Sequence, residues 1–337
     1  PRLTNWLLGS RLIGKPIKQG MGIHPDRKMP SFPGERFAAW ATKQGLHKKP
    51  QAKLSRKVAY FAGCTANYLF PQVARATVAF LQQSGIAVWF PSQQCCGMPA
   101  YLEGDAILAI KFAEANLAQL CQVVDQGFDI VCSCPTCGFM FRNLLKRGAY
   151  YAREYQEAIG APGDVILKPD KEKTADGTPR YLQYNKSIYG KILKDDGVFA
   201  SISALQRVKM AEHVFDLGEY IEQHQLKSEG KGDASGVDGD MVYFPPCHQR
   251  ELNIGKPYLR LLEQRYGSRV SSIDGELYCC GMAGIMGFKQ DFHESSRKLG
   301  QDLLDVLAKK APDLIVTDCL SCRLQFEQFT SFRVRHP

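Results

Sequence analysis

The sequence predicts an α/β protein with two pseudo-symmetric lobes, each built around a small parallel sheet. Three observations predict this class. Short β-prone runs alternate with helical patterns, and one arrangement of cysteines occurs twice along the chain. The composition, with 45% hydrophobic and 23% charged residues among 337, is that of a globular chain long enough for one large domain or two mid-sized ones.

Charge and composition exclude several classes of protein. Lys and Arg number 43 against 34 Asp and Glu, but the basic residues are scattered and no nucleic-acid motif is present, so we expect no nucleic-acid partner. We find no membrane-length run of about eighteen apolar residues and no leader peptide, and we expect a cytoplasmic protein. Because the chain begins with Pro1 and not Met, we expect it to be part of a longer polypeptide.

The predicted elements repeat in the two halves of the chain. In the first half we expect strands at 58–62, 86–90 and 129–132 and helices at 72–84 and 105–125. In the second half we expect strands at 241–244, 270–273 and 313–317 and helices at 256–265 and 291–309. Strands that alternate with helices of this length indicate parallel βαβ units.

Ten of the twelve cysteines form two sets with the same spacing. The first set is Cys64, Cys95, Cys96, Cys134 and Cys137, and the second is Cys247, Cys279, Cys280, Cys319 and Cys322. Matching members are 183 to 185 residues apart, and their flanks agree, as in "QQCCGMPA" and "LYCCGMAG". This regularity indicates an internal duplication. Each of these cysteines follows a predicted strand, so each set is expected at the carboxyl edge of a sheet.

The residues beside the cysteines suit bound sulfur. Gly97 and Gly281 follow the two vicinal pairs and permit a positive φ there. Helices are expected to start after Cys134 and Cys319, with Pro135 in a first turn, and a helix N-terminus stabilises an anionic thiolate.

Five thiols per half admit three interpretations. Disulfides are disfavoured because five is odd, adjacent cysteines rarely bridge each other, and no export signal is present. Structural zinc takes four ligands, often from two Cys-x-x-Cys pairs, whereas each half has only one such pair. Iron–sulfur clusters are held by thiolates, and we favour them. An ordinary cubane needs four cysteines, so a fifth implies an unusual cluster or a spare thiol.

At these motifs the chain resembles a known family. Over about 20–150 and 238–337 it is similar to the duplicated cysteine-rich CCG domain of heterodisulfide reductase catalytic subunits. That domain is also found in the iron–sulfur subunits of anaerobic glycerol-3-phosphate dehydrogenase, glycolate oxidase and lactate-utilisation complexes. The resemblance implies that each complete five-cysteine set binds a noncubane 4Fe–4S cluster, so that all ten motif cysteines are cluster ligands. It also implies that a disulfide substrate lies between the clusters.

Two redox hypotheses and one alternative follow. The first is an electron relay between a flavoprotein dehydrogenase or ferredoxin-like donor and a membrane quinone or cytochrome. The second is reduction of a disulfide or thiol-derived substrate, for which the candidate catalytic residues are Cys279, Cys280 and His248, the last as a proton or hydrogen-bond donor. The alternative is a non-redox protein with two structural zinc sites.

The remaining segments divide the chain. We expect a helical lead-in at 1–55, the first CCG repeat at 56–150, inserted helices and a flexible linker at 151–240, and the second repeat at 241–337. Within the insertion we expect an exposed loop at 168–180, helices near 187–194 and 204–226, and a linker from Lys227. The lead-in mixes apolar and basic residues, which admits peripheral membrane contact at the cytoplasmic face.

A few single residues carry weaker expectations. Cys121 and Cys132 lie outside the repeat and are expected to be buried, inert thiols. Lys289 is a candidate to offset cluster charge or bind an anionic substrate. Three histidines in helical stretches are expected at the surface: His213, His224 and His293.

Overall fold

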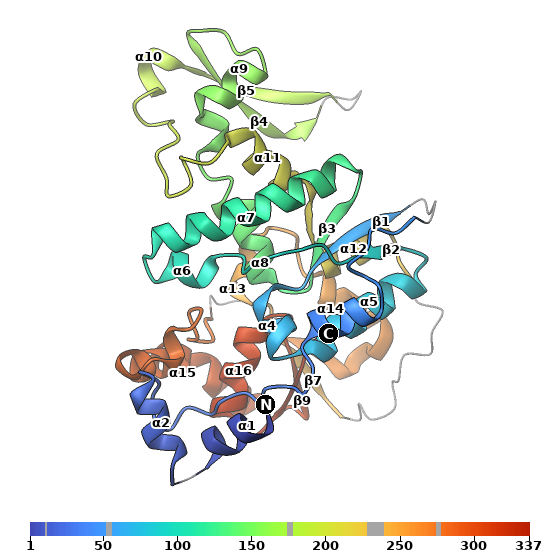
Figure 1. Ribbon diagram of the computed structural model, residues 1–337, viewed down its shortest axis with the longest axis vertical. Coiled ribbons are helices and arrows are strands. Elements are labelled where there is room, and N and C mark those ends of the chain that lie inside the picture. Colours follow the sequence, from blue (N-terminus) through green and yellow to red (C-terminus); the bar gives the residue numbers. More distant parts are fainter. Residues whose placement is uncertain (11, 52–55, 174–177, 228–238, 274–277) are drawn as a thin grey trace.

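The structure of the protein is a computed structural model, which describes residues 1–10, 12–51, 56–173, 178–227, 239–273 and 278–337. It contains two four-stranded sheets, each the centre of one lobe (Figure 1). The first lobe has strands β1 (Lys57–Phe61), β2 (Ala87–Trp89), β3 (Asp129–Cys132) and β6 (Val214–Asp216). The second lobe has strands β7 (Met241–Tyr243), β8 (Val270–Ser272), β9 (Leu314–Val316) and β10 (Arg333–Arg335).

The two sheets have the same topology. Their orders are β2-β1-β3-β6 and β8-β7-β9-β10, and every pairing in both is parallel. Matched strands therefore occupy matched places, which confirms the predicted α/β fold with two similar lobes. Strands β6 and β10 were not expected from the sequence, and each completes its sheet at the equivalent edge.

Helices fill the connections between strands. They are α1 (Arg2–Gly9), α2 (Gly14–Gly20), α3 (Phe37–Lys43), α4 (Gly63–Tyr68), α5 (Pro71–Gln83), α6 (Met98–Leu102), α7 (Ala106–Asp125), α8 (Pro135–Phe139), α9 (Arg153–Ala158), α10 (Lys186–Tyr189), α11 (Ala204–His213), α12 (Leu217–Gln223), α13 (Cys247–Glu251), α14 (Pro257–Tyr266), α15 (His293–Lys310) and α16 (Leu320–Phe329). Short π- or 3₁₀-helical turns are η1 (Met140–Leu144), η2 (Ala149–Tyr151), η3 (Gly267–Arg269), η4 (Met286–Phe288) and η5 (Gln290–Phe292).

Strand β1 has two buried faces because helices cover both sides of the first sheet. Val58 and Tyr60 belong to the core that includes α5, whereas Ala59 and Phe61 belong to the core that includes α7. Successive side chains of a strand point to opposite faces, so α5 and α7 lie on opposite sides of the sheet. This explains why β1 is apolar at almost every position, as buried parallel strands are.

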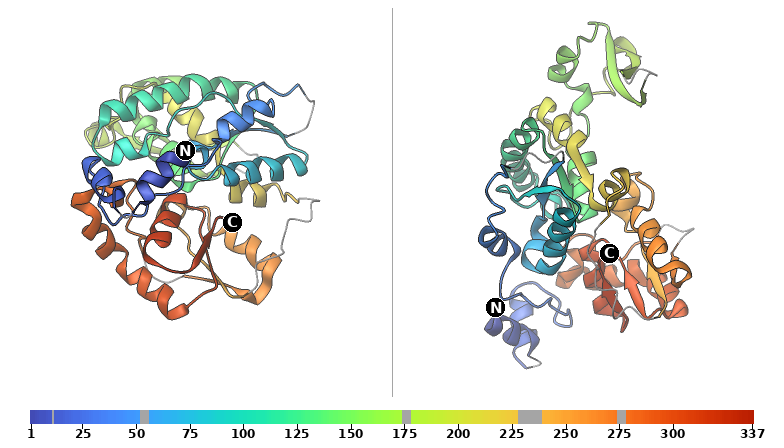
Figure 2. Two further views of the ribbon diagram at one scale, coloured as in Figure 1. Left: turned by 60° about the horizontal axis from the view of Figure 1, so that its bottom comes forward. Right: turned by 90° about the vertical axis from the view of Figure 1, so that its right-hand side faces the viewer.

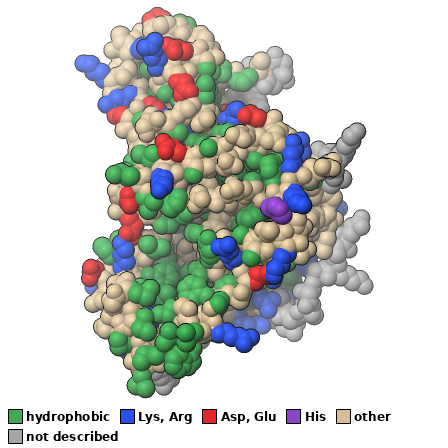
Figure 3. Space-filling model, in the orientation of Figure 1, with side chains coloured by type: hydrophobic (Ala, Val, Ile, Leu, Met, Phe, Trp, Pro, Cys, Tyr) green, Lys and Arg blue, Asp and Glu red, His purple; other side chains and the backbone are tan. Residues whose placement is uncertain are grey.

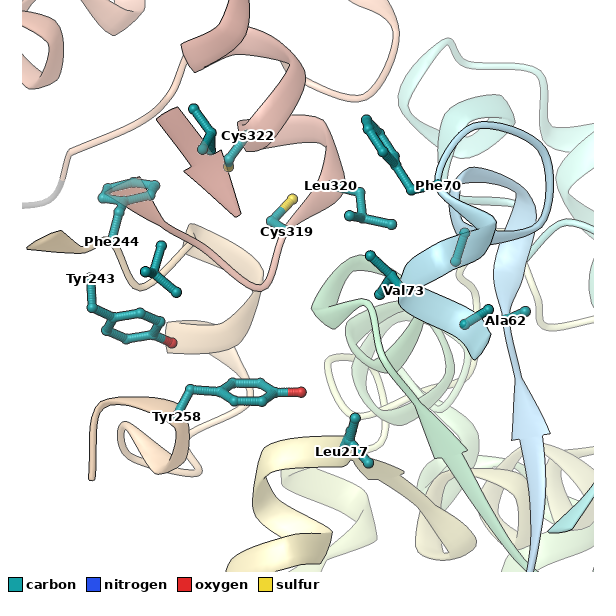
Figure 4. Close-up of a cluster of buried hydrophobic side chains, with 14 of the residues drawn as sticks. Ala62, Phe70, Val73, Leu217, Tyr243, Phe244, Tyr258, Cys319, Leu320 and Cys322 are labelled. Carbon is teal, nitrogen blue, oxygen red and sulfur yellow. The ribbon is translucent and has the colours of Figure 1, made fainter. Parts of the chain in front are cut away.

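One hydrophobic core runs through the contact between the lobes. Figure 4 shows Leu320 of α16 pointing toward Phe70 and Val73 of the first lobe, with Tyr258 of α14 beside Leu217 of α12. All five side chains are buried. Because this apolar surface is shared, the lobes are held in a fixed relation rather than as separate units.

Helix α7 is the one described helix that is long and apolar enough, by length and composition alone, to cross a membrane. It packs between the first sheet and α11, and Ala113, Leu117 and Leu120 are at most 1% exposed. Packing in the first lobe therefore accounts for its apolar composition.

The insertion differs from its prediction. The expected helix at 204–226 is divided into α11, β6 and α12, because residues 214–216 pair with β3. The expected loop at 168–180 lies largely in an antiparallel hairpin of β4 (Val165–Lys173) and β5 (Pro179–Asn185). The expected helix at 187–194 is only the short α10. Figure 2 shows the hairpin at the end of the molecule remote from the second lobe, and the predicted linker falls mostly outside the described residues.

The first part of the lead-in lies against the second lobe, although it precedes the first lobe in the chain (Figure 1), whereas α3 packs on α4 and α5 of the first lobe. The backbone N–H of His24 donates to Phe288 O at 2.9 Å, and its ring stacks on His293 with centroids 3.8 Å apart. His293 is only 5% exposed, so the expected surface position was wrong: the lead-in covers it. His213, by contrast, keeps 45% of its side chain exposed.

Candidate metal centres

Matched elements deliver the two cysteine sets. Cys64 lies in the first turn of α4 after β1, and Cys247 begins α13 after β7. Cys134 and Cys319 are the N-cap residues of α8 and α16, directly beyond β3 and β9. The vicinal pairs follow β2 and β8. Every motif cysteine therefore sits beyond the carboxyl end of a parallel strand, where such sheets bind ligands.

The structure brings the first five thiols together. The side chains of Cys64 and Cys95, Cys95 and Cys96, Cys96 and Cys137, and Cys137 and Cys134 lie close enough to shift the pKa of one another. These pairwise interactions connect all five thiols. Residues more than 70 positions apart in the sequence thus converge on one small volume.

The second set is arranged in the same way. The Sγ atoms of Cys280 and Cys322 are 3.0 Å apart. Cys279 lies close enough to Cys280, and Cys319 to Cys322, for the pair to shift the thiol pKa. Cys247 lies close enough to interact electrostatically with Cys319 and Cys280. All five residues of the second set are therefore gathered as well.

The second member of the Cys-Cys pair is favoured as the thiolate in each set, at matched positions. Hydrogen bonds from Cys137 and Cys95 lower the pKa of Cys96 to about 6. Hydrogen bonds from Cys279 and Cys322 hold the pKa of Cys280 well below its usual range. Burial instead raises the pKa of Cys247 to about 11. The second member of each Cys-Cys pair thus readily bears negative charge, the form that binds metals. In the first set, the interaction with Cys137 lowers the pKa of Cys134 as well.

Glycines allow the backbone to approach the sulfurs. Gly97 and Gly281 have φ of 93° and 84°, as predicted. The Gly281 N–H donates to Cys279 Sγ at 3.3 Å. At Gly63 an added Cβ would lie 2.8 Å from Cys137 Sγ, so a side chain there would enter the space of the thiols. This close approach of the backbone to the thiols suits a group bound through sulfur.

Two residues not identified from the sequence form buried hydrogen bonds near the cysteines. Asn116 of α7 is fully buried, accepts from Gln94 N at 2.9 Å and donates to Cys95 O at 2.9 Å. Gln325 of α16 is equally buried and donates to Ser296 Oγ at 3.0 Å. In the sequence, each of these two residues is marked only as a polar residue within an apolar helical pattern.

The predicted donor His248 lies between the lobes. Thr136 Oγ1, of the first lobe, is 3.0 Å from His248 Nδ1 and 3.8 Å from Cys319 Sγ. The His248 ring stacks on Phe139, with centroids 5.1 Å apart. Burial lowers the pKa of His248, which favours the neutral imidazole. The histidine therefore bridges α8 of the first lobe and the second cysteine set.

The weaker candidates lie elsewhere. Lys289 forms an ion pair with Glu103 of the first lobe, so its charge is balanced there. Cys121 and Cys132 are 6% and 0% exposed and belong to the first-lobe core, as expected. Burial raises the pKa of Cys121 to about 11, which keeps this thiol protonated and unreactive.

The donors match the chemistry of iron–sulfur clusters better than that of a single ion. Each set offers only sulfur, and soft thiolate ligands select such clusters. Within the described ranges, no group of three or more His, Cys, Asp and Glu side chains is placed to hold a metal ion. The five thiols of each set nevertheless converge, with helix N-termini and close backbone at their sides.

Comparison with known proteins agrees with this geometry. The CCG cysteine-rich domain matches residues 58–142 and again 241–327. The chain belongs to the CCG iron–sulfur family. Each match contains one of the two sheets up to its third strand and one complete cysteine set.

Two relatives extend the comparison beyond the CCG repeats. The chain is 26% identical over 329 residues to one subunit of the anaerobic glycerol-3-phosphate dehydrogenase of Escherichia coli K12, covering 96% of this chain and 68% of that protein. It is 25% identical over 238 residues to lactate utilization protein A 2 of Bacillus cereus, covering 69% and 74%. The first similarity thus includes the lead-in and the insertion as well as both CCG repeats.

Proposed function

We propose that each cysteine set holds one 4Fe–4S cluster of the noncubane kind. The convergence of five thiols in each lobe is the observation that carries this proposal. The ligands of the first cluster would be Cys64, Cys95, Cys96, Cys134 and Cys137, and those of the second Cys247, Cys279, Cys280, Cys319 and Cys322. When bound, such clusters supply one-electron redox chemistry. The proposed units are residues 56–150 and 241–337, with 1–55 as lead-in and 151–240 as insertion.

The function we propose is electron transfer within a dehydrogenase complex. A flavoprotein dehydrogenase or a ferredoxin-like domain would be the donor, and a membrane quinone or cytochrome the acceptor. The similarity to a glycerol-3-phosphate dehydrogenase subunit over 96% of the chain supports this assignment. The contact of Thr136 with both His248 and Cys319 supports a short path between the two centres.

Reduction of a disulfide is a second candidate function, favoured by the position of His248. The balanced reaction consumes one disulfide, two electrons and two protons and yields two thiols. Cys279 and Cys280 would lie at the reacting centre, and His248 would deliver a proton to a leaving thiolate. His248 lies between the lobes, so a substrate bound between the two cysteine sets would contact it.

Anaerobic kinetics separates the two functions. Protein with assembled clusters is reduced chemically and then mixed with either a quinone analogue or a small-molecule disulfide. Reoxidation of the protein by the quinone, without thiol production in the reaction with the disulfide, supports the relay. Thiol production that Cys280→Ser abolishes supports disulfide reduction, and failure of both acceptors contradicts both proposals.

We also propose that the protein works in the cytoplasm, with its lead-in against the membrane surface. Leu3, Trp6 and Leu12 are 69%, 64% and 87% exposed, and Arg2 and Lys15 lie beside them in the sequence. Figure 3 shows hydrophobic side chains gathered on the lower part of the molecule, where α1 lies. Apolar groups flanked by basic ones suit an anionic membrane surface. If wild type sediments with anionic vesicles and Trp6→Glu sediments less, the proposal is supported. Equal fractions of the two proteins in the vesicle pellet would contradict it.

A further inference from the structure

A buried arginine from the lead-in reaches the second cysteine set. Arg27 is 0% exposed. Its Nη1 donates to Gln325 Oε1 at 2.9 Å and its Nη2 to Met282 Sδ at 3.4 Å, while its Nε has no hydrogen-bond partner. Both acceptors are neutral, and no Asp or Glu in the described part of the chain forms an ion pair with it. A buried cation without a carboxylate is costly, so its retention calls for a compensating negative charge.

The immediate surroundings compensate this charge only in part. The guanidinium carbon lies 4.5 Å from the centroid of the Phe288 ring and 5.9 Å from that of Phe329. These cation–π contacts are favourable but weaker than an ion pair. Burial lowers the pKa of Arg27 to about 10, with negative charge at Cys280 acting in the opposite direction, so the group stays cationic at neutral pH.

Both partners of Arg27 belong to the segments that carry the cysteines. Met282 comes two residues after Cys280, and Gln325 comes one helical turn after Cys322. These two cysteines are in direct sulfur contact at 3.0 Å. The guanidinium is therefore held by residues next to the cysteines, and its hydrogen bonds go to Gln325 and Met282 and not to a cysteine sulfur.

The described residues of the first lobe show no counterpart of this arrangement. The residue one turn after Cys137 is Met140, where the second lobe has Gln325, and Met140 is 0% exposed and part of the apolar core. The guanidinium of Arg142 nearby is already neutralised by an ion pair with Glu219. The second site therefore has a fully buried cation without a carboxylate partner, Arg27, that the described part of the first lobe lacks, in addition to the half-buried Arg250 near Cys247.

The lead-in is held firmly enough to keep this charge in place. The backbone N–H of Lys28 donates to Gln328 Oε1 at 2.6 Å, and Lys18 Nζ donates to Arg27 O at 2.9 Å. The stacked His24 and His293 rings fix the same segment from the other side.

We propose that Arg27 makes the second centre the stronger electron acceptor of the two, so that electrons pass from the first lobe to the second. This rests on the proposed function, because it assumes a redox cluster in each lobe. Reduction adds negative charge to a cluster, and a fixed cation in a water-excluded site stabilises the reduced form. Arg27 acts as a positioning residue through the electrostatic field and not as a ligand.

Redox titration followed by electron paramagnetic resonance tests this inference. The clusters are assembled anaerobically, and Cys64→Ser and Cys247→Ser variants assign the signals to the two lobes. We expect the second-lobe cluster to have the higher midpoint potential. In Arg27→Met its ratio of reduced to oxidised form should fall at least tenfold at a fixed potential, about 59 mV for a one-electron couple, while the first-lobe signal does not move.

Two further variants control for packing and for charge in general. Lys28→Met removes a positive charge from the next residue, but that side chain is exposed, and we expect neither potential to change. Arg27→Lys keeps the cation and should retain the order of the two potentials, and it decides the question if Arg27→Met fails to fold. Unchanged potentials in Arg27→Met, or a reversed order in Arg27→Lys, overturn the inference. Wild-type protein that assembles no clusters contradicts the proposed function instead.

Discussion

Thr136 of the first lobe and His248 of the second are joined by a hydrogen bond of 3.0 Å between Oγ1 and Nδ1. The same hydroxyl lies 3.8 Å from Cys319 Sγ. Thr136 stands between Cys134 and Cys137 in its own lobe, so this one side chain connects both cysteine sets. The two halves of the duplication are therefore in direct polar contact at their sites, as well as through the shared apolar core.

Loss of this contact should weaken the junction of the lobes. In Thr136→Val the half-buried His248 loses its partner, and we expect the free energy of unfolding to fall by about 1 kcal/mol. Thr136→Ser retains the hydroxyl and should remain close to wild type. Urea unfolding of the three proteins measures this, and a valine variant as stable as wild type would show that the hydrogen bond contributes nothing.

Removal of one motif thiol should empty one site only. In anaerobically assembled Cys280→Ser we expect iron and acid-labile sulfide to fall by about half, because the favoured thiolate of the second set is gone. Cys121→Ser is the matched control, since Cys121 is also buried but lies outside both sets. Equal iron contents in the two variants would contradict the assigned ligands.

Gly281 should tolerate no side chain. Its φ is 84°, and an added Cβ would lie 2.1 Å from the carbonyl oxygen of Ser296. We expect Gly281→Ala to destabilise the protein by more than the roughly 1–3 kcal/mol that a left-handed backbone alone costs a non-glycine residue.

Gly85→Ala isolates that backbone cost. Gly85 has φ of 74° with no atom within 4 Å of an added Cβ, so only the conformational penalty applies there. Thermal unfolding of both variants gives the comparison. Equal losses at the two positions would show that close packing at Gly281 is unimportant.

Acid should loosen the lead-in. Burial, reinforced by His24, places the pKa of His293 below its ordinary value of 6.5, and its buried Nδ1 has no hydrogen-bond partner. The unfolded chain then binds more protons below about pH 6.5, so this contribution to stability is complete above that pH and is lost as the pH falls toward the folded-state pKa.

Replacement of this histidine should flatten the pH dependence. We expect the melting temperature of wild type to drop more between pH 7 and pH 5 than that of His293→Phe, which keeps an aromatic ring but cannot take up a proton. His47→Gln, at an exposed position, should behave like wild type. Identical pH profiles for wild type and His293→Phe would contradict the role of this histidine.

The repeat and the placement of its cysteines beyond the strands could be predicted because their signals are local or periodic. The spacing of Cys64, Cys95 and Cys134 recurs in the second half, and the strand before each cysteine fixes its place at a sheet edge. Gly97 and Gly281 could be identified from the sequence because each directly follows a Cys-Cys pair. Both adopt the expected positive φ.

Features decided by long-range contacts could not be predicted in this way. Residues 204–226 have an apolar pattern that fits one helix, but Val214 pairs with Ile130 of β3 and breaks it. The hydrophobic pattern of a segment does not indicate with which distant strand that segment will pair. The burial of Arg27 and His293 depends on where the lead-in packs. A stretch of mixed basic and apolar residues does not indicate that it packs against the second lobe.

We propose that each lobe gathers five thiols to hold an inorganic cluster. Metal and sulfide analysis of anaerobically purified protein, combined with electron paramagnetic resonance of the reduced sample, is the decisive test of this claim. We predict iron and acid-labile sulfide equivalent to two 4Fe–4S clusters per chain. Stoichiometric zinc with neither iron nor sulfide would contradict the claim and favour two structural zinc sites.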